Sequence, residues 1–237
     1  MKHCLVLVPG LMCDATVWQP LLPALSPLAD CTVVDHGDAH SLVQMAEQLL
    51  AQAPPRFALA GHSMGGRVAL EVMRRAPERV THLGLFDTGY LPKPAGVAGD
   101  EEARKRHALL AVAQHQGVRA MAAEWVKGMV APHRLNDAAL IDRILDMFAR
   151  KSADIFERQI RALLDRPDGT SVLQQVTVPS LVLCGQEDSW SPPSQHQAMA
   201  DWIPAHPPVV AIAGGGHMVT MEEPEAVAQA MCRWLGG

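Results

Sequence analysis

A serine lies between two glycines in the segment GHSMG, residues 61–65. The apolar run FALA before it has the length of a buried strand, and RVALEVMRR after it has helical spacing. So sharp a turn has no room for a side chain at Gly61 or Gly65, and it projects the Ser63 hydroxyl above the sheet, where the helix N-terminus favours a developing oxyanion. We interpret Ser63 as the nucleophile of an acyl transfer; the alternative is a tight glycine-rich turn with an idle serine.

A serine hydroxyl needs a base to take its proton, and His217 has the best context of the eleven histidines. It follows the apolar run PVVAIA through three consecutive glycines, a loop that can carry an imidazole over the carboxyl end of a sheet. His62 adjoins Ser63, but neighbouring side chains at a turn point apart. We therefore expect His62 to pack rather than to act as the base.

The base in turn needs a carboxylate that holds its tautomer and stabilises the imidazolium. Asp188 follows the run SLVLCG at an expected strand end and precedes His217, which gives the chain order Ser, Asp, His. Asp87 ends the preceding strand in LFDTGY and is the alternative. We favour Asp188 and expect Asp87 to satisfy backbone amides near the turn.

Acyl transfer also needs two donors for the tetrahedral oxygen. We expect the backbone amide of Met64, the residue after the nucleophile, to be one of them. The second is expected from the loop after the first apolar run, with Leu11 as the candidate and Met12 as the alternative. The side chains of Leu11 and Met64 are then free to shape an apolar wall.

Six apolar side chains are candidates for the wall of a substrate pocket, although plain packing is an alternative for each. Three recur every four residues and so share a helix face: Met121, Trp125 and Met129. Three others lie near the catalytic loops: Trp18, Trp190 and Met218. Arg67 follows Ser63 by one helical turn and is a candidate partner for a substrate carboxylate, with a structural or surface ion pair as the favoured alternative.

Short apolar runs alternate with helical patterns along most of the chain. The runs are Cys4–Val8, Cys31–Val34, Phe57–Ala60, Leu83–Phe86, Leu181–Cys184 and Val209–Ala213. The helical patterns are Ala15–Ala24, Leu42–Ala51, Met64–Arg75, Pro193–Trp202 and Pro224–Leu235. Continuous apolar runs suit strands buried on both faces, so the alternation predicts an α/β fold with a mostly parallel sheet.

Residues 91–176 interrupt this alternation, because they contain no convincing strand. Helices are expected there at Glu101–Gln114, Val118–Met129, Asp137–Ala149 and Ala153–Leu164. We interpret the segment as a helical cap over a core made of residues 1–90 and 177–237. The alternative is that these helices belong to the same core.

Composition excludes several classes of function. The net charge of -5, with no basic block, argues against nucleic acid as a partner, and no apolar stretch approaches the roughly 20 residues that span a membrane. The apolar run in MKHCLVLVPG is too short for a secretory signal. The five cysteines are odd in number and form no CxxC pair, so we expect reduced buried thiols, no metal site and a cytoplasmic protein.

These pieces resemble the α/β-hydrolase superfamily, and most closely its small bacterial carboxylesterase, lactonase and carbon–carbon hydrolase branch. The matching segments are LVLVPGLMCDATVW, FALAGHSMGGRVALEVMRRAPERV, LVLCGQEDSWSPP and GGGHMVTMEEPEAVAQAMCRWL. The resemblance implies a helical cap after the sixth strand of the family. The chain begins at the strand usually counted third, so we expect about six strands. Pro9-Gly10 stands where relatives commonly have His-Gly.

The site predicts a cofactor-free serine hydrolase for a small or medium, largely apolar carboxylic ester or lactone. Two alternatives use the same fold. One is a ligand sensor with slow or vestigial chemistry, and the other is perhydrolase or lyase chemistry at the same serine.

Overall fold

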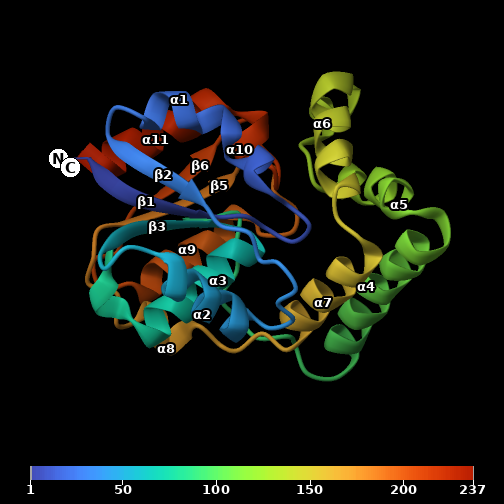
Figure 1. Cartoon of the computed structure of the whole chain (residues 1–237), viewed down its shortest axis with the longest axis horizontal. Helices are drawn as coiled ribbons and strands as arrows, with labels where there is room; N and C mark the ends of the chain where they lie inside the picture. Colours follow the sequence, from blue (N-terminus) through green and yellow to red (C-terminus); the bar gives the residue numbers. More distant parts are fainter. Residues whose placement is uncertain (1, 237) are drawn as a thin grey trace.

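Six strands form one sheet in the computed structural model, which describes residues 2–236 (Figure 1). The strand order is β2-β1-β3-β4-β5-β6, and every neighbouring pair is parallel. The strands are β1 His3–Val8, β2 Ala29–Val33, β3 Phe57–His62, β4 Val80–Phe86, β5 Ser180–Gly185 and β6 Val209–Ile212. This confirms the predicted α/β fold and its six strands; residues 1 and 237 of the expected core lie outside the described range.

The strand register brings the carboxyl ends of five strands to one edge of the sheet. Val8 of β1 lies beside Gly61 of β3, and His62 at the end of β3 lies beside Phe86 of β4. On the other side of β4, Gly185 of β5 lies beside Ile212 of β6. Each loop that carries a predicted site residue leaves the sheet at this edge, which is where ligands bind in open parallel sheets.

Core helices cover both faces of the sheet, with α1, α10 and α11 on one face and α2, α3, α8 and α9 on the other (Figure 1). Their bounds are α1 Leu22–Leu25, α2 Leu42–Gln52, α3 Met64–Arg75, α8 Thr170–Leu173, α9 Pro193–Trp202, α10 Val219–Glu222 and α11 Pro224–Gly236. Short 3-10 turns occur at Ala15–Val17, Gln19–Leu21 and Pro77–Arg79. The single helix expected over Ala15–Ala24 is wrong. Pro20 and Pro23 lack amide donors, and each takes the second position of a new short helical turn instead.

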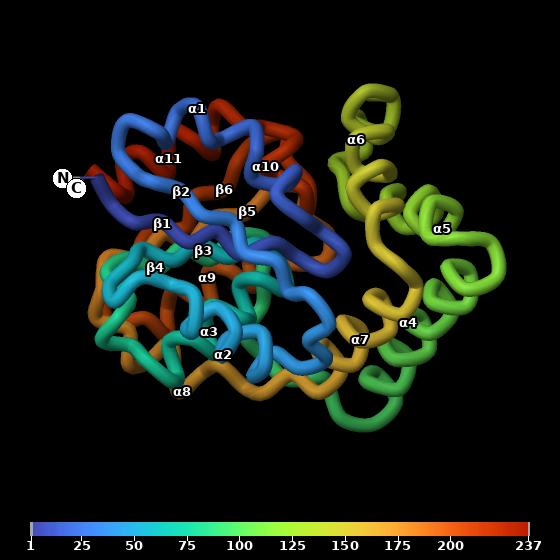
Figure 2. The backbone as a smooth tube through the Cα atoms, in the orientation of Figure 1, coloured from blue at the N-terminus to red at the C-terminus, as the bar shows by residue number. Residues whose placement is uncertain are grey.

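The segment 91–176 holds four helices where the sequence predicts them, although the helix predicted over Val118–Met129 ends at Trp125. They are α4 Val97–Gln116, α5 Val118–Trp125, α6 Ala138–Ala149 and α7 Ala153–Leu164, with 3-10 turns at Val126–Gly128 and Pro132–Asn136. Figures 1 and 2 show α4 to α7 together beside the sheet, on the side away from the chain termini. Gly117, with a positive φ of 92°, ends α4, and the side chain of Asp137 caps α6. We propose that this segment is the cap, with the exception of α8 at its end, which packs against α3 and α9 of the core.

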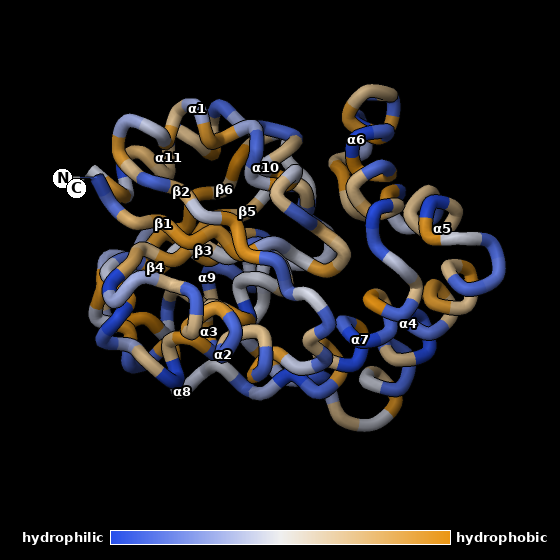
Figure 3. Tube along the Cα trace, in the orientation of Figure 1, coloured by the Kyte–Doolittle hydropathy of each residue, from blue (hydrophilic) through white to orange (hydrophobic). Residues whose placement is uncertain are grey.

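Apolar residues follow the sheet and the inner faces of the helices, as the hydropathy colouring shows along β1, β3 and β5 (Figure 3). All six residues of β3 are buried, which explains why its sequence shows no polar alternation. No helix between residues 2 and 236 is both long and apolar enough to cross a membrane.

Close packing of α3 against the sheet yields a prediction about Gly65. A Cβ at this position would lie 2.1 Å from the carbonyl oxygen of Val8 and 2.7 Å from that of Pro9. Backbone cannot move aside as a side chain can, so we expect Gly65→Ala to lower the free energy of unfolding by at least about 2 kcal/mol in urea denaturation. Gly236→Ala is the control, because a Cβ there meets nothing within 4 Å; equal losses in both variants would contradict the prediction.

Candidate active site

Ser63 connects β3 to α3 in a strained backbone conformation, with φ 54° and ψ -117°. Such a conformation persists only where the surroundings enforce it. Here the amide of Ser63 donates to the carbonyl of Phe86 at 2.9 Å, and the Thr88 hydroxyl donates to the carbonyl of Ser63 at 2.6 Å. The neighbouring strand β4 and its loop therefore hold the turn that exposes the serine hydroxyl.

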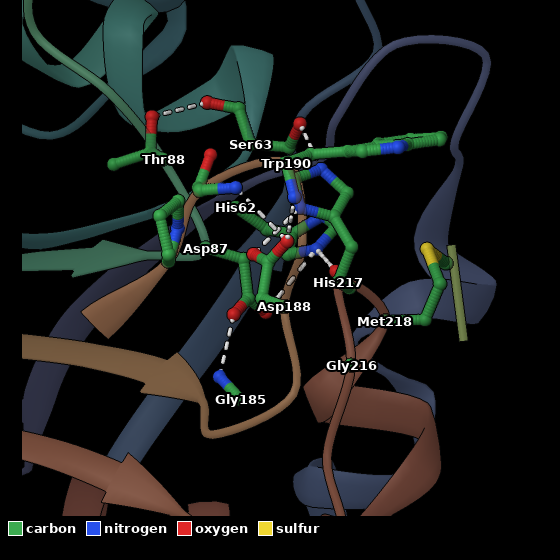
Figure 4. Close-up of polar contacts among 12 residues, drawn as sticks. His62, Ser63, Asp87, Thr88, Gly185, Asp188, Trp190, Gly216, His217 and Met218 are labelled. Carbon is green, nitrogen blue, oxygen red and sulfur yellow. Dashed lines mark hydrogen bonds and ion pairs between the residues drawn. The ribbon is translucent and has the colours of Figure 1, made fainter. Parts of the chain in front are cut away.

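Ser63, His217 and Asp188 form a continuous hydrogen-bonded row (Figure 4). The Ser63 hydroxyl lies 2.8 Å from Nε2 of His217, and Nδ1 of His217 lies 2.8 Å from Oδ2 of Asp188. With Nδ1–H donating to the carboxylate, Nε2 is free to accept the serine proton. The structure thus brings together the three residues that the sequence singles out, from the ends of β3, β5 and β6.

The carboxylate of Asp188 is buried but well satisfied. Its second oxygen, Oδ1, accepts hydrogen bonds from the amides of Trp190 at 2.9 Å and Ser191 at 3.0 Å. Burial alone would raise the pKa of Asp188, but His217 and the two amides outweigh it and lower the pKa to about 2. Asp188 is therefore a fixed negative charge behind the imidazole across the neutral pH range.

Asp87, the alternative partner for the base, faces a different set of atoms. It is fully buried, its Oδ1 accepts the amide of Gly185 at 2.8 Å, and its Oδ2 lies 3.7 Å from Nε2 of His62. Burial and the nearby charge of Asp188 raise its pKa well above the usual range, which favours the neutral acid. Its contacts are those of a residue that holds the ends of β4 and β5 together.

His62 packs behind the base. Its Nε2 donates to the backbone carbonyl of His217 at 2.7 Å, and its ring lies edge-on to Trp18 at 6.4 Å. Burial and the proximity of His217 lower the pKa of His62 to about 4, so it stays neutral at physiological pH. It thereby fixes the backbone of the histidine loop without adding charge.

Glu222, which sequence reasoning did not single out, holds the same loop from the other side. Its Oε1 accepts the amides of Gly216 at 3.0 Å and Met218 at 2.9 Å, and its Oε2 accepts the amide of Ala131 at 2.7 Å. Burial raises the pKa of Glu222, although the three amides oppose this. The acidic pair after the histidine was visible in the sequence, but nothing there indicated a partner 91 residues away.

The two residues that are expected to supply the oxyanion donors lie at the same cavity as the serine. Leu11 and Met64 both line the cavity in front of Ser63, and within residues 2–236 their amides make no hydrogen bond. The amide of Met12, the alternative to Leu11, donates to Oε1 of Gln159 on α7 at 2.7 Å. This engagement favours Leu11 over Met12 as the donor.

A cavity of about 860 Å³ opens between the sheet edge and the helices α4 to α7. Four of the predicted pocket residues line it: Trp125, Met129, Trp190 and Met218. Trp18 does not, because it is fully buried, with its ring 5.4 Å from the ring of Phe86. Met121 does not either; it is fully buried, and α5 ends at Trp125, so the assumed helix face shared with Met129 does not exist.

In the part of the chain that the structure describes, no group of three or more His, Cys, Asp or Glu residues is arranged to hold a metal ion. All five cysteines are free thiols. Cys13 and Cys184 are buried as expected, whereas Cys4 is exposed because alternate residues at the start of β1 point away from the core.

With this geometry in view, comparison with known proteins identifies the family. The model of the Alpha/beta hydrolase family matches residues 5–230, and the chain belongs to that family. A thermophilic esterase from Thermogutta terrifontis, solved with malate bound, superposes with a TM-score of 0.85 at 27% identity, covering 100% of this chain and 90% of the esterase. An enol-lactonase from Burkholderia xenovorans gives the same TM-score at 19% identity, covering 100% and 92%, which shows the shared fold.

Among curated proteins, the pimeloyl-[acyl-carrier protein] methyl ester esterase of Photobacterium profundum is 40% identical over 87 residues, which is 33% of this chain and 34% of that protein. The chain spans less than two thirds of the length of the curated relatives it matches first, with shares of 34%, 47% and 63% among them.

The contacts of Glu222 predict a specific loss of stability. In Glu222→Gln the new NH2 group must face at least one of three amide donors, so a buried hydrogen bond is lost. We expect the free energy of unfolding to fall by about 1–3 kcal/mol in urea denaturation. Glu223→Gln is the matched control, since it removes only a partly exposed ion pair with Arg134 and should cost less than about 1 kcal/mol. Equal costs would contradict the role assigned to Glu222.

The lowered pKa of Asp188 predicts an acid-dependent loss of stability. An acid whose pKa is lower in the folded state stabilises the fold above its unfolded pKa, and this contribution disappears as the pH falls through the folded value. With a folded pKa of about 2, Asp188 should account for about 2 kcal/mol lost between about pH 4 and pH 2. Urea denaturation over this range should therefore show a shallower loss in Asp188→Asn; parallel curves for the two proteins would contradict it.

Proposed function

We propose that this chain is a serine hydrolase that cleaves a small or medium, largely apolar carboxylic ester or lactone. The observation that carries the proposal is the row Ser63–His217–Asp188, with both hydrogen bonds at 2.8 Å, facing a cavity of about 860 Å³. The names of the esterase and lactonase relatives support the same class of reaction.

The proposed reaction begins when the Ser63 oxygen attacks the ester carbonyl while Nε2 of His217 takes the hydroxyl proton. The carbonyl π electrons move to oxygen, and the amides of Leu11 and Met64 stabilise that oxyanion. When the oxyanion collapses, the ester C–O bond breaks and His217 protonates the leaving alcohol. An acyl-serine remains.

Water completes the cycle. His217 takes a proton from water as the water oxygen attacks the acyl-serine. When the second tetrahedral intermediate collapses, the bond between the acyl carbon and the Ser63 oxygen breaks, His217 returns the proton to that oxygen, and the acid is released. Asp188, held at low pKa, stabilises each imidazolium that forms. The orienting bonds of His62 and Glu222 keep the histidine loop in place through both half-reactions, so little reorganisation is needed.

The first test is steady-state hydrolysis of p-nitrophenyl esters of increasing chain length. We expect turnover of short or medium esters by the wild type, and a loss of about three or more orders of magnitude in kcat for Ser63→Ala and Asp188→Asn. Asp87→Asn should keep most of its activity, because burial already favours the neutral acid and the amide can still accept from Gly185.

Three results would oppose the proposal. Activity of Ser63→Ala equal to wild type would exclude the acyl-serine, and a larger loss in Asp87→Asn than in Asp188→Asn would reassign the carboxylate. A wild type inert to every ester would favour a ligand sensor on this fold.

A further inference from the structure

The cavity in front of Ser63 has two chemically different parts. One part is aromatic: Trp190 lies 4.9 Å from the ring of His217 and stacks on Trp125 at 5.6 Å, and Trp125 lies 5.6 Å from Phe148. These side chains come from the loop after β5, the end of α5 and α6. Together with Met129 they form an apolar wall on the His217 side of the serine.

The other part is lined by arginines. Arg67 lies on α3 one turn after Ser63, so the two share a helix face about 6 Å apart along the axis. Arg106 of α4 and Arg166, just after α7, line the same region. α4 and α7, which carry Arg106 and lead into Arg166, pack against each other, and α6 lies at the other end of this helical segment (Figures 1 and 2).

One carboxylate serves this arginine group. Glu102 accepts two hydrogen bonds from Arg166, at 2.7 and 2.8 Å, and pairs with Arg106 at 2.9 Å. Arg67 forms no ion pair with any acidic side chain in residues 2–236. The three guanidinium groups therefore exceed the single carboxylate by two positive charges.

The guanidinium of Arg67 has N–H donors beyond the one that binds Leu91. Its Nη1 donates to the carbonyl of Leu91 at 2.8 Å, which fixes the side chain in place. Burial and the neighbouring cations Arg166 and Arg106 lower the pKa of Arg67 to about 9, which still leaves it charged at neutral pH. A partly buried cation without a counter-ion is costly, and an anion that enters the cavity would offset that cost.

We propose that Arg67 binds a carboxylate on the acyl part of the substrate, so that the preferred substrates are monoesters of dicarboxylic acids. The inference rests on the proposed hydrolase function. The direction follows from the chemistry: the leaving oxygen must reach Nε2 of His217, which places the alcohol at the aromatic wall. The acyl chain then extends along α3 toward Arg67.

The test compares two esters that differ only in the terminal group, mono-p-nitrophenyl adipate and p-nitrophenyl hexanoate. We expect the wild type to prefer the adipate by about 10- to 100-fold in kcat/KM, the range of a charge-assisted hydrogen bond. Arg67→Met should reduce this ratio to near one, and Arg67→Lys should retain part of it. Added salt should lower the wild-type ratio, since it screens the attraction.

Arg161→Met is the matched control. Arg161 lies on α7, is 70% exposed, pairs with Asp165 and is not among the residues that line the cavity. In the Arg161→Met variant, the ratio of kcat/KM for the adipate to kcat/KM for the hexanoate should equal that of the wild type. A merely structural role for Arg67, through its bond to Leu91, would change both esters alike and leave the ratio intact.

Binding of esters to the Ser63→Ala protein tests carboxylate binding by Arg67 separately from the proposed hydrolase function, because binding needs no turnover. Calorimetry with monoethyl adipate and ethyl hexanoate should show the same preference and the same dependence on Arg67. Hydrolysis of the hexanoate with no preference for the adipate, or a preference that survives in Arg67→Met, would overturn the inference while the hydrolase stands. Absence of all hydrolysis would overturn the hydrolase, and with it the substrate class.

Discussion

The close approach of α3 to the ends of β1 and β3 is the constraint on which the site depends. Gly65 lies against the carbonyls of Val8 and Pro9, and Gly61 lies against the backbone of Gly65. Only this contact distance lets the chain turn from strand to helix at one residue, which forces Ser63 to a positive φ. The Ser63 hydroxyl then lies at the sheet edge from which the other loops of the site also leave. The remaining site residues therefore only have to be held in place there.

The site residues are held in place by buried polar groups, of which Asp188 and Glu222 do not line the cavity. Asp188 accepts two amides besides His217, Asp87 fastens β4 to β5, and Glu222 gathers three amides around the histidine loop. Burial would normally make such carboxylates costly, but each is compensated by donors or favoured as the neutral acid. The backbone of His217 is thereby held at both of its polar groups: its carbonyl accepts from His62, and its amide donates to Met129 in the cap segment.

Much of this arrangement was predictable from sequence because its signals are local. The span of α3, the six strands and the positions of Ser63, Asp188 and His217 follow from apolar runs, glycines and their order along the chain. Most of the failures concern contacts between distant segments. Periodicity shows that Met121 and Trp125 share a helix face, but not which neighbour that face contacts. No sequence pattern links Glu222 to Ala131 or shows that Arg67 pairs with no acidic side chain within residues 2–236. The prolines in residues 15–24 were a local signal that the helix prediction overlooked.

The bonds between the histidine loop and the cap limit how the cavity can open. The amide of His217 donates to the carbonyl of Met129 at 2.6 Å, and Glu222 binds the amide of Ala131. A movement that lifted residues 129–131 would displace the histidine loop, and with it His217, from Ser63 and Asp188. Substrate access that leaves these two bonds intact therefore cannot involve movement of residues 129–131 away from the histidine loop. Met129 belongs to the aromatic wall, so this side of the cavity is tied to the histidine loop, whereas Arg67 lies on the core helix α3.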